Sequence, residues 1–138
     1  MSRRLISPLL TAAVLAVCMV GCSKNEGSAL DEVPALDEVQ LQRTLSQGKY
    51  AFIEFGGRHC IPCRRMQPIL AELAREHGTT ITIANVFVQE QMKLGRQYRI
   101  RLIPTQVICD KDGKEIFRHT GFWEKSQILA TWRELRIL

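Results

Sequence analysis

The stretch YAFIEFGGRHCIPCRRMQPILAELAREH, residues 50–77, decides the fold of this chain. Its first part, Tyr50 to Phe55, is a short apolar run that predicts a buried strand. From Ile61 to His77 the apolar side chains recur at helical spacing, which predicts an amphipathic helix. Cys60 and Cys63 stand at the junction with two residues between them, so their sulfurs can close a small disulfide ring and open it again.

The position of Cys60 at the start of the predicted helix favours its thiolate form. The unpaired amides of a first helical turn and the positive end of the helix dipole both stabilise a negative sulfur. Arg58, Arg64 and Arg65 add positive charge nearby. Because the thiolate is the nucleophile that attacks other disulfides, the motif indicates a thiol–disulfide redox protein.

Two other uses of the cysteine pair are weighed against this interpretation, an inert structural disulfide and half of a zinc site. Zinc takes about four ligands, and the chain has no second CxxC, although His59 and Cys109 could be recruited. Covalent haem requires a histidine after the second cysteine, where the chain has Arg64. We therefore expect no metal and no cofactor, and we expect Cys109 to be a small core residue.

The first 21 residues are typical of a secretion signal. Arg3 and Arg4 precede an apolar run from Leu9 to Val20, which is too short for a comfortable membrane span. Met19-Val20-Gly21-Cys22 resembles a bacterial lipobox, although leucine is usual where Met19 stands. In lipoproteins the signal is cut before the cysteine, whose sulfur then carries lipid. We therefore predict a lipoprotein signal peptide over residues 1–21 and lipidation of Cys22; the alternative is an ordinary signal peptide and a spare thiol.

Polar sequence separates this segment from the rest of the chain. Residues 22–34 show no apolar periodicity, so we predict a flexible tether there. Removal of residues 1–21 would leave 17 basic and 14 acidic side chains, a net charge of +3. This weak charge, without a lysine-rich tract or a basic stripe, does not favour a nucleic acid as a partner.

The remaining sequence predicts one α/β domain over residues 35–138. Helices are expected over about Leu36–Leu45, Ile61–His77, Gln91–Tyr98 and Lys125–Leu135, and strands over Tyr50–Phe55, Thr80–Val88, Thr105–Cys109 and Glu115–His119. Pro68 should bend the second helix or end its first segment. The order of elements suits one central mixed sheet flanked by helices on both faces.

This organisation resembles the thioredoxin family over residues 35–138. The resemblance rests on a CxxC after the first strand, on Pro68 eight residues past Cys60, and on Ile103-Pro104-Thr105 before the third strand. Tyr98, Ile100 and Gly113 also fall where the family usually has Tyr, Ile and Gly. The resemblance implies a thioredoxin fold, and we expect a monomer.

The resemblance also implies a role for each matching residue. Cys60 would be the nucleophile that attacks a substrate disulfide, and Cys63 would be the resolving thiol that frees the product. Pro104 would be a cis-proline that lets Ile103 offer its backbone groups to an extended substrate. Glu54 would be a buried acid beneath the cysteines, with a raised pKa that lets it take the proton from Cys63.

Several positions depart from the family pattern. His59 replaces a tryptophan, and we assign it with Ile103 to the substrate-binding side of Cys60, where an imidazolium could also stabilise the thiolate. A simple exposed substitution is the alternative for His59. Gly56-Gly57 replaces a bulkier pair. Asn85 stands where the family has a lysine that pairs with the buried acid, so Glu54 is expected to hold its proton more tightly.

Together these features predict a thiol–disulfide oxidoreductase that acts on the thiols and disulfides of exported proteins. It would be lipid-anchored in the bacterial cell envelope and face the periplasm, in either the inner or the outer membrane. We favour a reductant, with cytochrome c maturation as one use, because tethered family members often have this role and are recharged by a membrane electron-transfer partner. A disulfide-forming oxidase and a redox-inactive binding module are the alternatives.

Overall fold

The computed structural model describes residues 33–138, so the predicted signal peptide, Cys22 and most of the predicted tether lie outside the described residues. The elements are α1 (Glu38–Leu45), β1 (Tyr50–Gly56), α2 (Ile61–His77), β2 (Ile81–Phe87), α3 (Met92–Gln97), β3 (Thr105–Cys109), β4 (Glu115–Thr120) and α4 (Lys125–Glu134). This order confirms the one predicted from the sequence, with boundaries shifted by one or two residues. None of the helices in the described residues is long and apolar enough to cross a bilayer.

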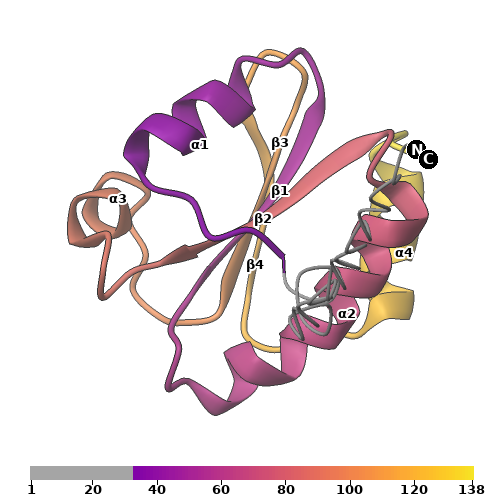
Figure 1. The fold of residues 1–138 in the computed structure, drawn as a ribbon. Coiled ribbons are helices and arrows are strands. Elements are labelled where there is room, and N and C mark those ends of the chain that lie inside the picture. Colours follow the sequence, from indigo (N-terminus) through magenta and orange to yellow (C-terminus); the bar gives the residue numbers. More distant parts are fainter. Residues whose placement is uncertain (1–32) are drawn as a thin grey trace, which may run out of the picture.

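The four strands form one mixed sheet in the order β2-β1-β3-β4. β1 runs parallel to β2 and antiparallel to β3, and β4 pairs antiparallel with β3. Helices α1 and α3 cover one face of the sheet, whereas α2 and α4 cover the other (Figure 1). The predicted architecture, a central mixed sheet with helices on both faces, is therefore confirmed.

The side chains of β1 point alternately to the two faces of the sheet and contribute to the hydrophobic core on each face. Successive side chains of a strand point to opposite faces of its sheet. On the face covered by α2 and α4, the ring of Phe52 lies 6.1 Å from that of Trp123 and 5.8 Å from that of Trp132, measured between centroids. On the opposite face Phe55 packs with Leu41 of α1. The active-site helix α2 is thus seated on a fully packed sheet.

Helix α2 begins directly after Cys60 and contains two prolines. Pro62 lies in the first turn, where a missing N–H costs no helical hydrogen bond. The helix continues through Pro68 to His77, so Pro68 does not end its first segment. The ribbon of α2 changes direction along its length (Figure 1), as expected for a helix with an internal proline.

The segment before α1 is part of the fold. Val33 is 3% exposed and packs in the core beneath α2 and α4. The backbone of Ala35 forms an isolated parallel bridge with Asn85 on β2. Val33 and Pro34 were expected to belong to the flexible tether, because their local composition shows no periodicity. In the structure Val33 is instead buried, and the carbonyl oxygen of Pro34, an exposed residue, accepts a hydrogen bond from the backbone of Asn85.

Candidate active site

A disulfide joins Cys60 and Cys63 at the start of α2, immediately after the carboxyl end of β1. Cys60 is the N-cap residue of the helix, and its Sγ accepts a hydrogen bond of 3.2 Å from the backbone N–H of Cys63. Cys60 is half-buried, whereas Cys63 is only 2% exposed. A second protein can therefore reach the sulfur of Cys60 but not that of Cys63.

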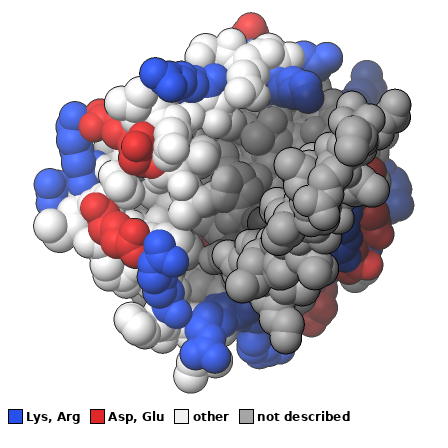
Figure 2. Space-filling model, viewed as in Figure 1, with Lys and Arg blue, Asp and Glu red and all other residues white. Residues whose placement is uncertain are grey.

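Part of the positive charge near Cys60 is offset by an acidic side chain that the sequence did not indicate. Figure 2 shows basic side chains gathered at the lower edge of the molecule, the end at which α2 begins in Figure 1. Arg58 forms an ion pair of 2.6 Å with Glu90 and lies 4.2 Å from the centroid of the Phe87 ring. The first turn of α2 contains no acidic residue, so no negative side chain there opposes the helix amides in stabilising a thiolate at Cys60.

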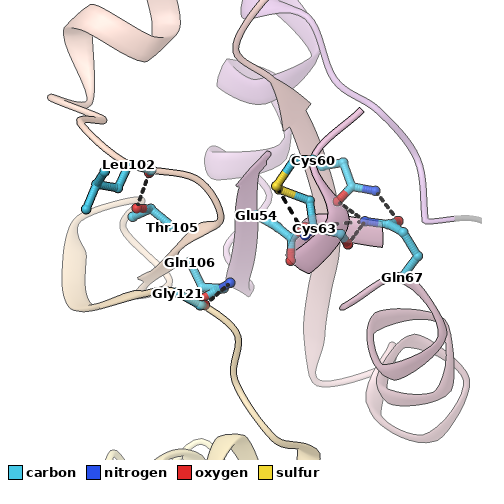
Figure 3. The surroundings of a disulfide bond; sticks show 9 residues. Glu54, Cys60, Cys63, Gln67, Leu102, Thr105, Gln106 and Gly121 are labelled. Carbon is cyan, nitrogen blue, oxygen red and sulfur yellow. Dashed lines mark hydrogen bonds between the residues drawn. A yellow bond between two sulfur atoms is a disulfide. The ribbon is translucent and has the colours of Figure 1, made fainter. Parts of the chain in front are cut away.

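Glu54 lies beneath the disulfide on the face of β1 that α2 covers, between Cys63 and Gln106 (Figure 3). Its side chain is completely buried. Burial raises the pKa of Glu54 from its usual 4.5 to about 8, and the neighbouring amides of Gln106 and Gln67 lower it only in part; Gln67 donates to Oε1, whereas Oε2 has no hydrogen-bond partner among the described residues. The burial and the raised pKa expected from the sequence are confirmed, while its role in proton transfer stays a prediction.

Gly56 lies beside both the carboxyl group of Glu54 and the sulfur of Cys63. A Cβ at this position would lie 3.2 Å from Oε1 of Glu54 and 3.4 Å from Sγ of Cys63. The two atoms therefore border the same volume beside the Gly56 backbone. Reduction of the disulfide would place a thiol proton beside this space, which is the arrangement that proton transfer to Glu54 would need.

The side of Cys60 that faces solvent adjoins the loop before β3. The Ile103–Pro104 peptide bond is cis, as the sequence comparison implied, and Pro104 is buried. Ile103, His59 and Cys60 line a hollow of about 400 Å³. Within the part of the chain that the structure describes, the backbone N–H and C=O of Ile103 have no hydrogen-bond partner. The predicted substrate-binding residues are thus brought together around the accessible sulfur.

A family model for thioredoxin matches residues 32–134. The chain belongs to the thioredoxin family. It is 30% identical over 95 residues to a thioredoxin from Alicyclobacillus acidocaldarius, an alignment that covers 69% of this chain and 90% of that protein. It is 32% identical over 85 residues to a thioredoxin from Mycobacterium tuberculosis, covering 62% of this chain and 72% of that protein.

Solved thioredoxin structures show the same fold. A mutant thioredoxin from Halobacterium salinarum superposes with a TM-score of 0.68 at 22% identity, covering 75% of this chain and 90% of that one. The oxidised mitochondrial thioredoxin 3 of Saccharomyces cerevisiae gives a TM-score of 0.65 at 21% identity, covering 74% of this chain and 94% of that one. With its Cys60–Cys63 pair in place, this member of the thioredoxin family is a thiol–disulfide oxidoreductase.

The third described cysteine of this thioredoxin-family protein is separate from the site. Cys109 is a free thiol with 1% of its surface exposed, which confirms the predicted core position. Burial raises its pKa to about 11, so the thiol stays protonated and unreactive near neutral pH. Among residues 33–138 no group of three or more His, Cys, Asp or Glu side chains is arranged to hold a metal ion.

Two polar residues behind the disulfide were missed by sequence reasoning. Gln67 is one helical turn past Cys63, and its Nε2 donates to Oε1 of Glu54 at 3.3 Å. Gln106 is the cross-strand neighbour of Glu54 on β3 and is completely buried. The signal for Gln67 was its spacing of four residues from Cys63 on the same helix face; the signal for Gln106 was a polar residue inside an apolar strand.

The substitution Glu54→Gln is expected to remove a pH-dependent part of the stability of the oxidised protein. The pKa of Glu54 in the folded state, about 8, lies above its ordinary value of 4.5. The unfolded chain therefore loses this proton first as the pH rises. The contribution is complete below about pH 4.5 and is lost as the pH rises to about 8, a fall of about 4 kcal/mol in the free energy of unfolding.

Denaturant unfolding of the oxidised protein at several pH values between 4.5 and 8.5, compared between wild type and Glu54→Gln, measures this difference. Glu134→Gln, an exposed position on α4, is the matched control and should follow the wild-type curve. Parallel curves for wild type and Glu54→Gln would show that the folded carboxyl does not hold its proton in this pH range.

Proposed function

We propose that this protein reduces disulfide bonds in exported proteins while a lipid on Cys22 holds it at a bacterial membrane, facing the periplasm. The observation that carries the exchange reaction is the unequal exposure of the two joined sulfurs, Cys60 half-buried and Cys63 buried. A reachable sulfur can form a bond with a client, and a buried neighbour can then displace that client. The anchor and the compartment rest on the sequence of residues 1–22.

The reaction begins with both cysteines reduced. The thiolate of Cys60 attacks one sulfur of the client disulfide, the client S–S bond breaks, and one client sulfur leaves as a thiolate. Cys63 then loses its proton, and its sulfur attacks the sulfur of Cys60. The Cys60–Cys63 bond forms, the second client thiolate leaves, and two electrons have passed from the protein to the client.

Glu54 serves as the proton acceptor for Cys63 in this scheme. A pKa of about 8 leaves a fraction of the carboxyl ionised at neutral pH, and that fraction can take the thiol proton. The protonated majority supports the opposite step, in which a membrane electron-transfer partner reduces the disulfide and Cys63 must regain a proton. A carboxyl near its midpoint therefore suits a protein that alternates between oxidation states.

The client binds along the loop before β3. The free backbone groups of Ile103 can pair with an extended segment as an added strand would. His59 borders the same hollow, and the exposed apolar side chains of Ile61 and Leu102, 72% and 67% exposed, offer contact surface beside it. The site thus recognises an accessible disulfide in an extended stretch of chain, cytochrome c maturation being one process that requires such reduction.

A disulfide-forming oxidase is the second candidate function, and the helix start favours it. Stabilisation of a thiolate makes the reduced form of a dithiol more stable and its disulfide more oxidising. The N–H of Cys63 and the amino end of α2 both act on Cys60 in this direction. The two candidates therefore differ in reduction potential and not in the order of the chemical steps.

A Cys63→Ser variant is expected to accumulate mixed disulfides with exported proteins in cells, because the second attack needs the Cys63 thiol. Non-reducing gels of cell envelopes, trapped at low pH, measure these adducts, and mass spectrometry identifies the clients. The matched controls are a Cys60→Ser variant, which should trap nothing, and Cys109→Ser, which should behave as wild type. Adducts that persist without Cys60 would remove that residue from the mechanism.

A reductant of exported proteins requires a reduction potential of the Cys60–Cys63 pair that lies nearer to about −270 mV, the value of a reducing thioredoxin, than to about −120 mV, the value of a strong periplasmic oxidant. Equilibration of the full chain with defined thiol–disulfide buffers, read by alkylation of the free thiols, gives the value. A potential more positive than about −150 mV would favour the oxidase instead.

Cys22→Ser is expected to abolish incorporation of labelled fatty acid and to leave the signal peptide uncleaved, because in lipoproteins the cysteine sulfur carries the lipid and the cut is made before that cysteine. Fractionation of cells and incorporation of labelled fatty acid measure the change, and density separation of the wild type shows which membrane carries it. A serine variant that is still cut before residue 22 and released would indicate an ordinary signal peptide and would contradict the lipobox interpretation.

A further inference from the structure

A buried row of polar side chains crosses the sheet below the disulfide. Glu54 on β1 pairs in register with Asn85 on β2 and with Gln106 on β3. None of the three is more than 1% exposed. Buried polar groups cannot turn to water, so the hydrogen bonds that they make with other parts of the protein fix where each one points. The orientation of Glu54 toward Cys63 must therefore be set by its neighbours.

Gln67 connects this row to α2. Its Nε2 has Oε1 of Glu54 at 3.3 Å, Oδ1 of Asn85 at 3.3 Å and the carbonyl oxygen of Cys63 at 3.5 Å as acceptors. The shortest hydrogen bond of Gln67 is the one its Oε1 accepts from Nδ2 of Asn85, at 2.9 Å. Asn85 thus holds both ends of the Gln67 amide, and the contact with Glu54 follows from that placement.

Asn85 is in turn held by the first residues of the described chain. Its Nδ2 donates to the carbonyl oxygen of Val33 at 3.2 Å. Its backbone N–H donates to Pro34 at 2.8 Å, and its backbone carbonyl accepts from Leu36 at 2.8 Å. The buried side chain of Val33 fixes this segment to the core. A continuous path therefore runs from residues 33–36 through Asn85 and Gln67 to Glu54.

We propose that Asn85 and Gln67 are positioning residues for the Glu54–Cys63 pair and that residues 33–36 are the third member of this device. The proposal rests on the exchange function given above and adds that the entry of the chain into the domain is part of its active site. The amide pair is uncharged, so it directs the carboxyl without forcing it to stay ionised.

Loss of any contact along this path is expected to shift the pKa of Glu54 in the same direction, upward. Donation from Gln67 favours the ionised form of Glu54, so a misplaced Gln67 raises the pKa of the carboxyl and leaves a smaller fraction of it ionised and able to accept a proton at neutral pH. The neighbours that shift the pKa of Glu54 are the amides of Gln106 and Gln67, and no charged side chain contributes. The attack of Cys60 on a client needs neither amide, so only the second chemical step should respond.

The experiment follows both steps in one trace. The reduced full-length lipoprotein in detergent is mixed with an aromatic disulfide whose thiolate is coloured; the first phase reports attack by Cys60 and the second reports attack by Cys63. In Gln67→Met and Asn85→Leu we expect the midpoint of the second phase to move up by about one pH unit, with a rate at pH 7 about tenfold lower. The first phase should stay within about twofold of wild type.

Matched variants separate this device from general damage. Val33→Asp lifts the segment from the core and should reproduce the shift, whereas Val39→Asp, at a position 58% exposed on α1, should not. Gln97→Met removes an exposed amide and is the control for Gln67→Met. The double variant Gln67→Met/Asn85→Leu should shift no further than either single variant, because both remove the same path.

The outcomes distinguish the inference from the function on which it rests. A second phase in Gln67→Met with the wild-type midpoint, together with an intact first phase, overturns the positioning role. A normal midpoint in folded Val33→Asp, with the shift retained in Gln67→Met, removes residues 33–36 from the device and overturns the proposal as stated. Absence of both phases in the wild type would overturn the exchange function itself.

Discussion

The start of α2 at Cys60 is the constraint on which the site depends. β1 ends at Gly56 and the helix begins at Ile61, so the sulfur of Cys60 must lie over the unpaired amides of the first turn. The same helix turn carries Cys63 inward, where it is shielded from solvent. One local feature therefore gives one sulfur to the client and keeps the other for release. The packed sheet beneath α2 keeps this geometry rigid.

The proton-acceptor role proposed for Glu54 requires a carboxyl that works without a fixed charge beside it. Glu54 is buried among amides, so burial alone dominates its pKa and places it close to neutrality. A cation in place of Asn85 would favour the carboxylate and lower that pKa, whereas an apolar residue there would leave buried amide groups unpaired. The uncharged side chains of Asn85 and Gln67 place no cation beside Glu54, and they hydrogen-bond to each other instead of being left unpaired. Gly56 keeps the space beside Cys63 open.

Sequence reasoning succeeded where local pattern decides the structure and failed where distant residues meet. Apolar periodicity and turn residues located every helix and strand, and the apolar neighbours of Glu54 indicated its burial. Gln67 was missed because a polar residue on an amphipathic helix usually faces water, and its partner Asn85 lies 18 residues away. Val33 was assigned to the tether because its burial depends on tertiary contact alone.

The charged side chains around Cys60 bear on whether the protein acts as a reductant or as an oxidant. Three arginines close to Cys60 in the sequence suggested strong stabilisation of a thiolate, which would favour an oxidant. In the structure Arg58 is paired with Glu90, and Arg65 lies over the ring of Phe122, 4.4 Å from its centroid. The negative charge of Glu90 offsets much of the field that Arg58 would exert on the sulfur. The helix start and the charges of Arg64 and Arg65 remain as sources of thiolate stabilisation at Cys60, and the proposed reductant and the alternative oxidase differ in how strongly these act on the sulfur.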